Sequence, residues 1–474
     1  MNTPLTRRRL LVQALIGAGL VAAPGLPELL AAPDLLVANV TQLYSVRVAR
    51  IATPRSADEV AKAIAAWPGR VAVGGGRYSM GGQTATENAL QLDMRRFNRI
   101  LEFSAERREI RVQAGITWRE ILEYIDPHNL SPQIMQSYAN FTVGGALSVN
   151  AHGRYIGQGP LVLAVRSIKL VLADGSLVVA SPTENPALFY GAIGGYGGLG
   201  VIVEATLGLS DNRKLARESQ SMPLGAYRQF FDQQVRGNSR MVMHNAILYP
   251  DDYDRVRAVS YLISDAPLTV NERLVPPERN YKAMRTALSV AGSKSGSKLR
   301  EALVDPLLYQ APQVQWRNRE ASLDVRELQP ISGPDYSYVL QEYFVPEAQL
   351  EAFVADMRGV LTEHQVKLTN ISIRHAKADP GTLLAWARGD TFALVLYYRQ
   401  GSSAAERAAV GGWTRQLIDL AIAHQGTYYL PYQIHASRKQ FLAAYPRAPE
   451  FFALKKQLDP SNKFRNKLWD TYYR

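Results

Sequence analysis

Hydrophobic and polar positions in the first half of the chain follow two different periods. A helical spacing begins after Ser56, which can cap a helix, and a second helical spacing begins at Thr117. Strand-like runs separate these helices. The strand-like runs are 70–73, 108–114 and 201–207. Short strands therefore alternate with helices, but their spacing is too irregular for a repeated βαβ unit.

Residues 166–180 contain two runs rich in β-formers that meet at Asp174-Gly175. An Asp-Gly pair between such runs favours a two-residue turn of type I′, because both residues tolerate positive φ. The pattern therefore predicts a β-hairpin with that turn.

The second half of the chain, from 211 to 425, has longer elements. The clearest are strands at 338–345 and 392–398 and helices at 348–361 and 404–424. The stretch 290–298 is rich in glycine, serine and lysine, which is typical of a mobile loop. We interpret this half as a separate substrate domain.

Composition limits the classes of function. With 474 residues, 47% hydrophobic and 20% charged, the chain is long enough for two or three globular domains. The net charge of +12 comes from scattered lysines and arginines, so we expect no nucleic-acid partner, and an anionic ligand such as a phosphorylated cofactor fits better. Cysteine is absent, which excludes disulfides, thiol nucleophiles and thiolate metal sites. The seven histidines show no metal-binding spacing, so we predict no metal.

The N-terminus has the pattern of an export signal. Arg7-Arg8-Arg9 precedes two leucines, an apolar run extends to Ala23, and small residues follow at 31–32. Paired arginines before leucines resemble a twin-arginine signal, which exports folded proteins. The apolar run has about 14 residues, and a permanent bilayer span needs about 20. We therefore expect a signal over 1–32, export to the periplasm and no permanent membrane span; an ordinary secretory signal or an uncut anchor are the alternatives.

Two glycine-rich segments could hold phosphates, at 74–82 and 142–148, and a third glycine-rich segment lies at 191–200. Glycines let backbone N–H groups turn toward an anion and let the chain approach a pyrophosphate closely. Gly195, Gly197 and Gly200 match the Rossmann spacing, but a strand follows them where that motif requires a helix. We interpret the segments as phosphate-binding loops of another fold.

Several motifs occur together in an order that resembles a known family. They are Gly74-Gly75-Gly76-Arg77-Tyr78-Ser79, Gly144-Gly145, Asn150-Ala151-His152-Gly153, Asp174-Gly175, Gly197 to Ile202, Tyr445-Pro446, Phe452 to Lys455, Asp459-Pro460, Phe464 and Asn466. The chain resembles, over about 45–474, FAD-linked oxidases of the vanillyl-alcohol oxidase and p-cresol methylhydroxylase (PCMH) superfamily. It looks closest to alditol and aldonolactone oxidases and to decaprenylphosphoryl-ribose oxidase.

That resemblance implies an α+β fold. A two-subdomain FAD-binding domain of the PCMH type would occupy 33–210, and an α+β substrate (cap) domain with an antiparallel sheet would occupy 211–425. A C-terminal segment, 426–474, would return to the FAD-binding domain. The N-terminal 32 residues would be the signal.

The resemblance also implies FAD as the cofactor. The residues it assigns to FAD are Gly74, Gly75, Gly76, Arg77, Tyr78, Ser79, Gln83, Asn140, Thr142, Val143, Gly144, Gly145, Ser148, His152, Gly153, Gly200, Ile202 and Asn466. The loop 74–79 would wrap the pyrophosphate, and 140–153 would follow the ribityl chain and flavin ring. Many relatives have a histidine, covalently bonded to the flavin, at the position of Arg77. We therefore predict that FAD is bound non-covalently.

The implied reaction is oxidation of a CH–OH group by hydride transfer to flavin N5, which also needs a group that takes the hydroxyl proton. We predict His435 as the base and Arg374 as an anchor for substrate or flavin charge, with Gln341 and Tyr343 lining the substrate pocket. Ser372 stands where alditol oxidases have glutamate. The expected substrate is a sugar, polyol, lactone or related hydroxyl compound, and the electron acceptor is oxygen, a quinone or a cytochrome.

Two further functions remain open at this point. One is oxidation of a lipid-linked sugar or an aromatic alcohol, and the other is flavin binding without catalysis. Purely structural roles for these residues also remain open: His435 could form a hydrogen bond between domains, and Arg374 could form a salt bridge.

Overall fold

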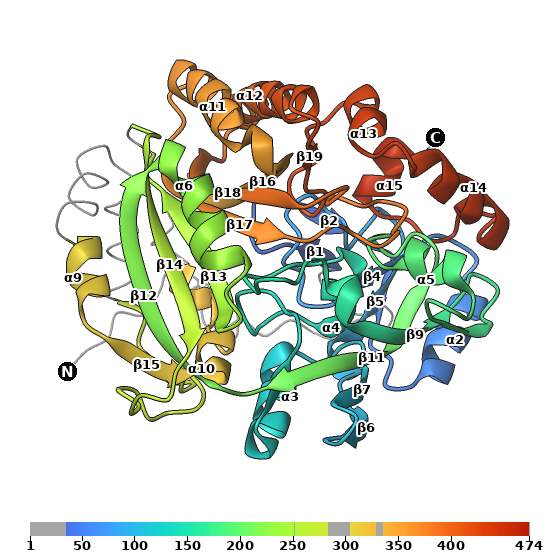
Figure 1. Ribbon diagram of the computed structural model, residues 1–474. Coiled ribbons are helices and arrows are strands. Elements are labelled where there is room, and N and C mark those ends of the chain that lie inside the picture. The colour runs from blue at the N-terminus through green and yellow to red at the C-terminus, as the bar shows by residue number, and fades with distance from the viewer. Residues whose placement is uncertain (1–34, 251, 283–303, 329–334, 474) are drawn as a thin grey trace, which may run out of the picture. The chain divides into compact units, whose positions relative to one another are not determined.

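The computed structural model describes residues 35–250, 252–282, 304–328 and 335–473 (Figure 1). The signal expected at 1–32 and the loop expected at 290–298 lie outside these ranges. The chain divides at Leu35, and the description below concerns the unit that begins at Leu36. Among its described helices, none combines the length and the apolar character needed to cross a bilayer.

A small parallel sheet holds the first glycine segment. Its strands, in the order β3-β5-β4, are β3 (Arg50–Ala52), β5 (Leu90–Asp93) and β4 (Val71–Gly74). Helix α2 (Ala57–Ala66) links β3 to β4, and its N-cap Ser56 accepts from the Glu59 amide as the sequence predicts. The buried side chains of Val60 and Ile64 pack into one core with those of β4 and β5. The glycine segment therefore leaves from a strand end that is fixed by packing.

A second sheet is antiparallel and has six strands. Its path is β10-β9-β11-β7-β6, and β8 pairs with β11 off this path. The strands are β6 (Ile100–Ser104), β7 (Glu109–Gln113), β8 (Leu130–Pro132), β9 (Val165–Val171), β10 (Leu177–Ala180) and β11 (Val201–Asp211). Helix α3 (Trp118–Ile125) begins at Thr117, whose capping box with Glu120 confirms the predicted start.

The β9–β10 hairpin forms as predicted, but the turn type is wrong. Gly175 has φ +84, and the residue before it is not in the left-handed region. The Gly175 amide donates to the Leu172 carbonyl at 3.0 Å, and the Leu172 amide donates to the Ser176 carbonyl at 2.9 Å. A type I turn followed by a single left-handed glycine explains this pattern, so only one of the two turn residues needs positive φ.

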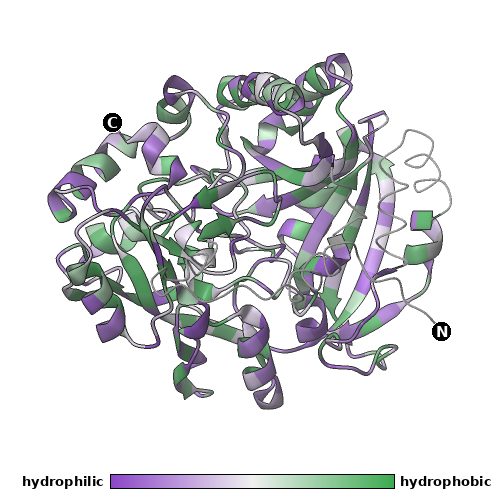
Figure 2. Cartoon of the chain, turned by 180° about the vertical axis from the view of Figure 1, so that it is seen from behind, coloured by the Kyte–Doolittle hydropathy of each residue, from purple (hydrophilic) through white to green (hydrophobic). Residues whose placement is uncertain are grey.

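The largest sheet is antiparallel and eight-stranded, in the order β15-β12-β14-β13-β17-β18-β16-β19. Its strands are β12 (Lys214–Pro223), β13 (Met241–Leu248), β14 (Arg255–Ile263), β15 (Gln313–Trp316), β16 (Tyr336–Pro346), β17 (Leu368–Ala376), β18 (Thr391–Gly401) and β19 (Thr427–Tyr428). Helices α11 (Leu350–Glu363) and α12 (Ala404–Ala423) lie together over β16 and β18 (Figure 1). Both helices carry hydrophobic and hydrophilic residues along their length (Figure 2), as expected for helices with one face on a sheet.

The chain ends in three helices that return to the first sheets. They are α13 (Arg438–Ala444), α14 (Ala448–Leu458) and α15 (Lys467–Tyr472). Phe464 forms a parallel bridge with Val71 of β4. The buried Lys455 ammonium donates to the carbonyl of Gly198, in the third glycine segment, at 2.9 Å. The C-terminal segment is thus tied to the glycine segments by backbone and side-chain contacts.

The remaining described elements are short. They include β1 (Leu36–Ala38) and β2 (Ser45–Arg47), which pair with each other, and helices α5 (Pro186–Ala192), α6 (Leu224–Phe230), α9 (Asp305–Gln310) and α10 (Arg317–Ala321). The mixture of helices and antiparallel sheets confirms the α+β class. The predicted boundaries at 210 and 425 remain predictions; β11 ends at Asp211 and β19 begins at Thr427.

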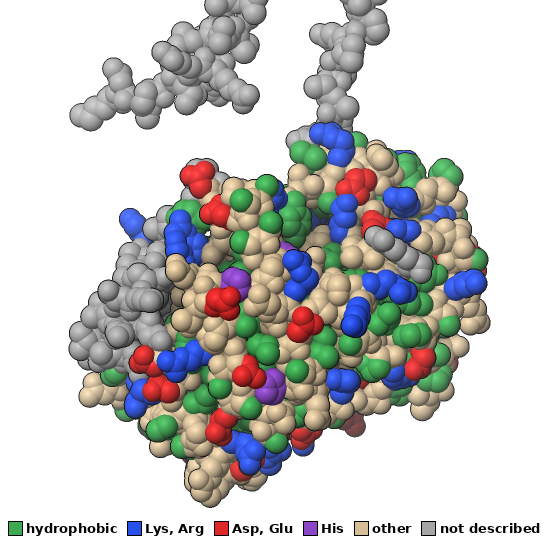
Figure 3. All heavy atoms as spheres, turned by 90° about the horizontal axis from the view of Figure 1, so that it is seen from above, with side chains coloured by type: hydrophobic (Ala, Val, Ile, Leu, Met, Phe, Trp, Pro, Cys, Tyr) green, Lys and Arg blue, Asp and Glu red, His purple; other side chains and the backbone are tan. Residues whose placement is uncertain are grey.

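On the face seen in Figure 3, basic and acidic side chains are interspersed.

Candidate active site

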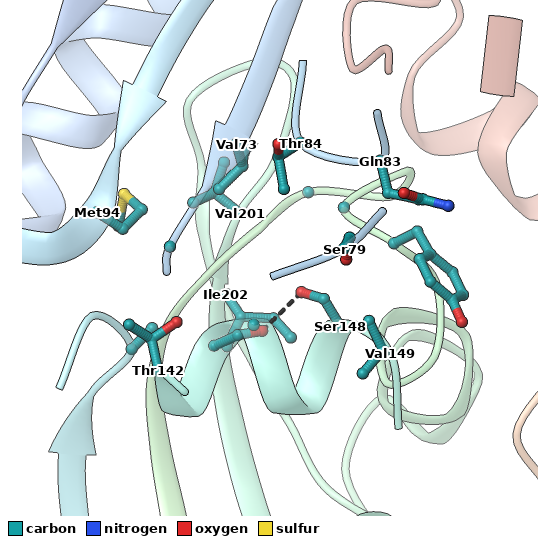
Figure 4. A pocket seen from close by; sticks show the side chains of 17 residues that line it. Val73, Ser79, Gln83, Thr84, Met94, Thr142, Ser148, Val149, Val201 and Ile202 are labelled. Atoms are coloured by element: carbon teal, nitrogen blue, oxygen red, sulfur yellow. Dashed lines mark hydrogen bonds between the residues drawn. The ribbon is translucent and has the colours of Figure 1, made fainter. Parts of the chain in front are cut away.

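A narrow cavity of about 60 Å³ lies where β4, β11 and helix α4 (Val143–Ser148) meet (Figure 4). Its lining residues are Val73, Gly75, Ser79, Gln83, Thr84, Met94, Ala114, Thr142, Gly144, Gly145, Ser148, Val149, Tyr196, Gly197, Gly200, Val201 and Ile202. All three glycine-rich segments contribute to this list. The first and third segments are more than a hundred residues apart in the sequence, and the three-stranded and six-stranded sheets bring all three to one place.

The first glycine segment presents unused backbone donors. Its residues 76–79 follow β4 without forming a helix or strand, and their amides donate no hydrogen bond to another described residue. Arg77 has φ +60, in the left-handed region. Successive amides around a left-handed residue form a concave nest that binds anions such as phosphate. This segment therefore fits a pyrophosphate.

The second glycine segment is a short helix rather than the loop that the sequence suggested. Thr142 is its N-cap, and the buried Thr142 Oγ1 has no hydrogen-bond partner among the described residues. A Cβ on Gly75 would lie 2.1 Å from that oxygen. Glycine at 75 thus lets the two segments approach, and the orphaned hydroxyl is a donor for a ligand between them.

A wider cavity of about 210 Å³ adjoins the narrow one. The two share Gly75, Ser79, Thr84, Thr142, Gly145 and Val149. The wider cavity is also lined by Val40, Gly76, Arg77, Tyr78, Met80, Gln136, Ser137, Tyr138, Phe141, Ala146, Ala151, His152, Val325, Leu340, Glu342, Arg374, Val395, Tyr429, Pro431 and Tyr432. It lies between the glycine segments and the face of the large sheet formed by β16, β17 and β18. A narrow cleft that adjoins a broad one fits a dinucleotide whose ring faces the large sheet.

Glu342 of β16 and His152 meet in the wall of this wider cavity. His152 Nε2 lies 2.6 Å from Glu342 Oε1, and the Tyr432 hydroxyl donates to Glu342 Oε2 at 3.2 Å. The Glu342 side chain is 2% exposed and that of His152 4%. Burial, followed by the nearby charge of Glu342, raises the pKa of Tyr432 well above its usual value, so this phenol stays protonated and donates.

Arg374 of β17 lines the same cavity. Its Nε is buried without a hydrogen-bond partner, and within the described ranges its guanidinium forms no salt bridge. The other arginine of the lining, Arg77, is held by Asp93 at 3.1 Å. Burial lowers the pKa of Arg77, and Asp93 opposes that shift. Arg374 is therefore the lining cation without a carboxylate partner.

These features define a protein that holds a dinucleotide cofactor beside a pocket with acid–base groups. Residues 48–181 match a family model described as "FAD binding domain". This segment covers β4, the first two glycine segments and the β9–β10 hairpin. The chain therefore contains an FAD-binding domain, and the resemblance to the vanillyl-alcohol oxidase and PCMH superfamily is confirmed.

Curated relatives agree with that assignment. Cytokinin dehydrogenase 2 from Arabidopsis thaliana is 30% identical over 149 residues, which is 31% of this chain and 30% of that protein. L-galactono-1,4-lactone dehydrogenase 2, mitochondrial, from Oryza sativa subsp. japonica is 33% identical over 131 residues, or 28% and 22%. Alditol oxidase from a Streptomyces species is 36% identical over 102 residues, or 22% and 24%. The chain thus spans less than a third of each of these three proteins.

The structure brings most of the predicted site residues to the two cavities. Those that line them are Gly75, Gly76, Arg77, Tyr78, Ser79, Gln83, Thr142, Gly144, Gly145, Ser148, His152, Gly200, Ile202 and Arg374. Those that do not are Gly74, Asn140, Val143, Gly153, Gln341, Tyr343, His435 and Asn466. Two of the second group bond to other segments of the chain: the Asn140 side chain accepts from the Val325 amide at 2.7 Å, and Asn466 caps α15 while donating to the Tyr196 carbonyl at 2.8 Å.

Two lining side chains are already engaged by the protein. The Gln83 amide nitrogen donates to the carbonyls of Leu430 and Tyr432 at 2.6 and 2.8 Å, and its oxygen accepts from the Gly81 amide. The Ser148 hydroxyl donates to the Gly144 carbonyl at 2.7 Å (Figure 4). Gln83 therefore fixes the glycine segment to the C-terminal segment through its side chain.

The prediction that Gln341 and Tyr343 line the substrate pocket is wrong, because the residue between them, Glu342, faces the cavity. The Tyr343 hydroxyl donates to Gln341 Oε1 at 2.8 Å, and Gln341 donates to Thr414 of α12, so both side chains lie on the helix-covered face. Alternation along β16 then places Glu342 on the opposite face, toward the cavity. The sequence did contain this signal, because a single acidic residue in the apolar run 339–345 is costly unless it has a partner.

His435 is not brought to the cavity. Its ring packs against α12, where a Cβ on Gly411 would lie 3.2 Å from His435 Nδ1. Burial, with a smaller effect from Arg415, lowers the pKa of His435 to about 4. The Arg415 guanidinium of α12 donates to the His435 carbonyl at 3.4 Å, so this segment lies against the helix. Proximity in sequence to the pocket therefore did not place this imidazole in it.

Proposed function

We propose that this protein is an exported FAD-dependent oxidoreductase that oxidises a CH–OH group of a small molecule. The observation that carries the proposal is the buried pair of Glu342 and His152, in the wall of the cavity that adjoins the phosphate-binding cradle. Relatives in part of the chain are named as dehydrogenases and oxidases, which supports the same class of reaction.

The pair supplies the proton acceptor that such a reaction needs. Both His152 nitrogens face acceptors, since Nδ1 lies 3.3 Å from the Gly153 carbonyl and Nε2 lies 2.6 Å from Glu342. The Nε2 contact fits an imidazole N–H that donates to the Glu342 carboxylate and holds it in place. Glu342 can then take the hydroxyl proton as the carbon loses its hydride, and the alcohol becomes a carbonyl. FAD, when bound, accepts that hydride.

Two features support non-covalent binding of FAD. The position at which many relatives attach the flavin through histidine is Arg77, whose guanidinium is turned to Asp93 at 3.1 Å. The chain contains no cysteine for a second kind of link. Precipitation of the purified protein with acid should release all flavin into the supernatant; flavin that stays with the pellet would contradict this point.

The export part of the proposal rests on the sequence of residues 1–32 alone. A twin-arginine route suits a protein that must acquire a cytoplasmic cofactor before translocation. Replacing Arg7-Arg8-Arg9 with lysines and following the protein by cell fractionation tests it. Retention of the variant in the cytoplasm is expected, and unchanged export would contradict this route.

The proposed activity is tested with the mature protein purified with its flavin. An anaerobic screen of sugars, lactones, hydroxy acids and aromatic alcohols should find donors that bleach the flavin absorbance. Reoxidation of the reduced protein by oxygen, a quinone and cytochrome c, each alone, then identifies the acceptor. Bound flavin that no donor reduces would overturn the proposal and leave a flavin-binding protein.

A further inference from the structure

We propose that the substrate is a hydroxy acid with an aromatic or branched aliphatic body, whose carboxylate binds Arg374 and whose hydroxyl faces Glu342. This inference rests on the proposed function and specifies its substrate class. It comes from the charge, the shape and the lining of the wider cavity.

Arg374 needs an anion that the described protein does not provide. Its Nε is buried without a partner, and no described carboxylate lies within salt-bridge range of its guanidinium. A buried N–H donor without an acceptor costs free energy, which a bound anion would recover. A guanidinium fork matches the planar geometry of a carboxylate, with two parallel hydrogen bonds.

The other charged side chains of the described lining already have partners. Arg77 and Arg95 share Asp93, and the Glu342 carboxylate contacts His152 and the Tyr432 hydroxyl. Arg374 is thus the cation of that lining with no carboxylate contact. Its planar guanidinium matches one carboxylate of the ligand.

The rest of the substrate side of the cavity is mainly apolar and aromatic. The side chains that give it this character are Tyr78, Tyr138, Phe141, Val325, Leu340 and Val395. The Tyr78 and Phe141 rings pack edge to face, with centroids 4.6 Å apart. A polyol would bring several hydroxyls against these carbons, and each buried hydroxyl needs a hydrogen-bond partner. An aromatic or branched aliphatic body needs none.

The two polar groups reach the cavity from different strands. Glu342 and Ser372 are both in register with Val395 of β18, so β18 separates β16 from β17, and Arg374 lies two residues beyond Ser372 on the same face. Strands two apart in a sheet are roughly 10 Å apart. The side chains extend toward each other over Val395, which leaves room for a small ligand that bonds to both. Alditol oxidases have a glutamate at the position of Ser372. Because serine carries no carboxylate, Glu342 is the acidic side chain that faces the ligand here.

The reaction is balanced by the groups named. The carbon loses a hydride to the flavin, its hydroxyl proton passes to Glu342, and the C–O single bond becomes the carbonyl of an oxo acid. The carboxylate stays bound to Arg374 and keeps its charge throughout. The product leaves with no other bond broken.

Two measurements on the flavin-loaded protein test the inference. Benzoate, which cannot be oxidised, should perturb the flavin absorbance as it binds, and benzyl alcohol should do so more weakly. Mandelate should bleach the flavin anaerobically at least ~10-fold faster than benzyl alcohol at equal concentration. In R374Q the benzoate dissociation constant should rise at least ~10-fold, whereas R374K should retain part of the affinity.

Arg399→Gln is the matched control, because the Arg399 guanidinium is exposed on neighbouring β18, over the Tyr336 ring at 3.9 Å and outside the cavity. It should leave benzoate affinity unchanged. The inference is overturned if wild-type protein does not bind benzoate, or if R374Q weakens benzoate and benzyl alcohol equally. Reduction by neutral donors without preference for mandelate would also overturn it, while leaving the proposed function intact; no reduction by any donor would instead overturn the function.

Discussion

His152 Nε2 lies 2.6 Å from Glu342 Oε1, although 190 residues separate the two side chains in the sequence. One comes from the segment after helix α4, beside the phosphate-binding cradle, and the other from β16 of the large sheet. Their contact joins the FAD-binding domain to the sheet that we assign to substrate binding. Because both are buried, neither can lose its partner without leaving an unsatisfied polar group in the cavity wall.

Glu342→Gln should slow anaerobic reduction of the flavin by an active donor by at least ~100-fold, because the amide cannot accept the hydroxyl proton. Glutamine keeps a hydrogen bond to His152, so flavin content and the unfolding midpoint should change little. Stopped-flow absorbance gives the reduction rate. His435→Ala serves as the control, since that imidazole packs against α12, and should reduce at a rate within ~3-fold of wild type. A slow H435A with a normal E342Q would restore the first assignment of the base.

The sequence predicted the cofactor cradle better than it predicted the catalytic groups. Glycines at 75–76 and 144–145 can be recognised in the sequence, because the backbone freedom that a glycine gives belongs to the residue itself. The function of Glu342 depends on which face of β16 the large sheet turns toward the cavity, and that face is fixed by α11 and α12 on the other side. His435 shows the same limit: its position in the chain suggested the pocket, but the path of the backbone after Tyr432 leads elsewhere.

Gly75→Ala should lower the affinity for FAD by at least ~10-fold. A Cβ at this position would lie 2.1 Å from Thr142 Oγ1, so the nest and α4 would have to separate by about an ångström at the point where the pyrophosphate binds. Gly237→Ala is the matched control, since a Cβ there meets no atom within 4 Å. Titration of flavin-depleted protein with FAD, followed by fluorescence quenching, measures both. Equal affinities for G75A and wild type would contradict the placement of the cofactor.

Lys455→Met should destabilise the protein by about 3–5 kcal/mol, because it leaves the buried Asp459 carboxylate without its counterion. The ammonium is fully buried and donates to Asp459 at 2.9 Å, as well as to the carbonyls of Gly198 and Phe464. Denaturant unfolding of the flavin-loaded protein gives the change in free energy. Exposed Lys456→Met should cost less than ~0.5 kcal/mol. Similar values for the two variants would show that the pair contributes little to stability.

Glu347 should make stability depend on pH below about 5. It belongs to a group with His375 and Asp390 whose ligand atoms lie within 4.8 Å of one another in the described part of the chain. Arg236 and Lys377 already hold its two carboxylates, at 2.5 and 2.6 Å, so we interpret the group as an ion-pair network. The hydrogen bond to His375, and then Arg236, outweigh burial and lower the pKa of Glu347 to about 2.

A carboxylate whose pKa is lower in the folded state stabilises the fold above its unfolded pKa, and this contribution disappears as the pH falls through the folded pKa. Glu347→Gln should therefore cost about 1–2 kcal/mol at pH 7, allowing for solvent screening of this half-buried group, and the cost should shrink steadily between pH 5 and pH 2. Urea unfolding at pH 7, 5 and 3 measures this difference. E363Q, which removes an exposed carboxylate at the end of α11, should change stability by less than ~0.5 kcal/mol. A cost for E347Q that is the same at pH 7 and pH 3 would contradict the role of the ionised carboxylate in this network.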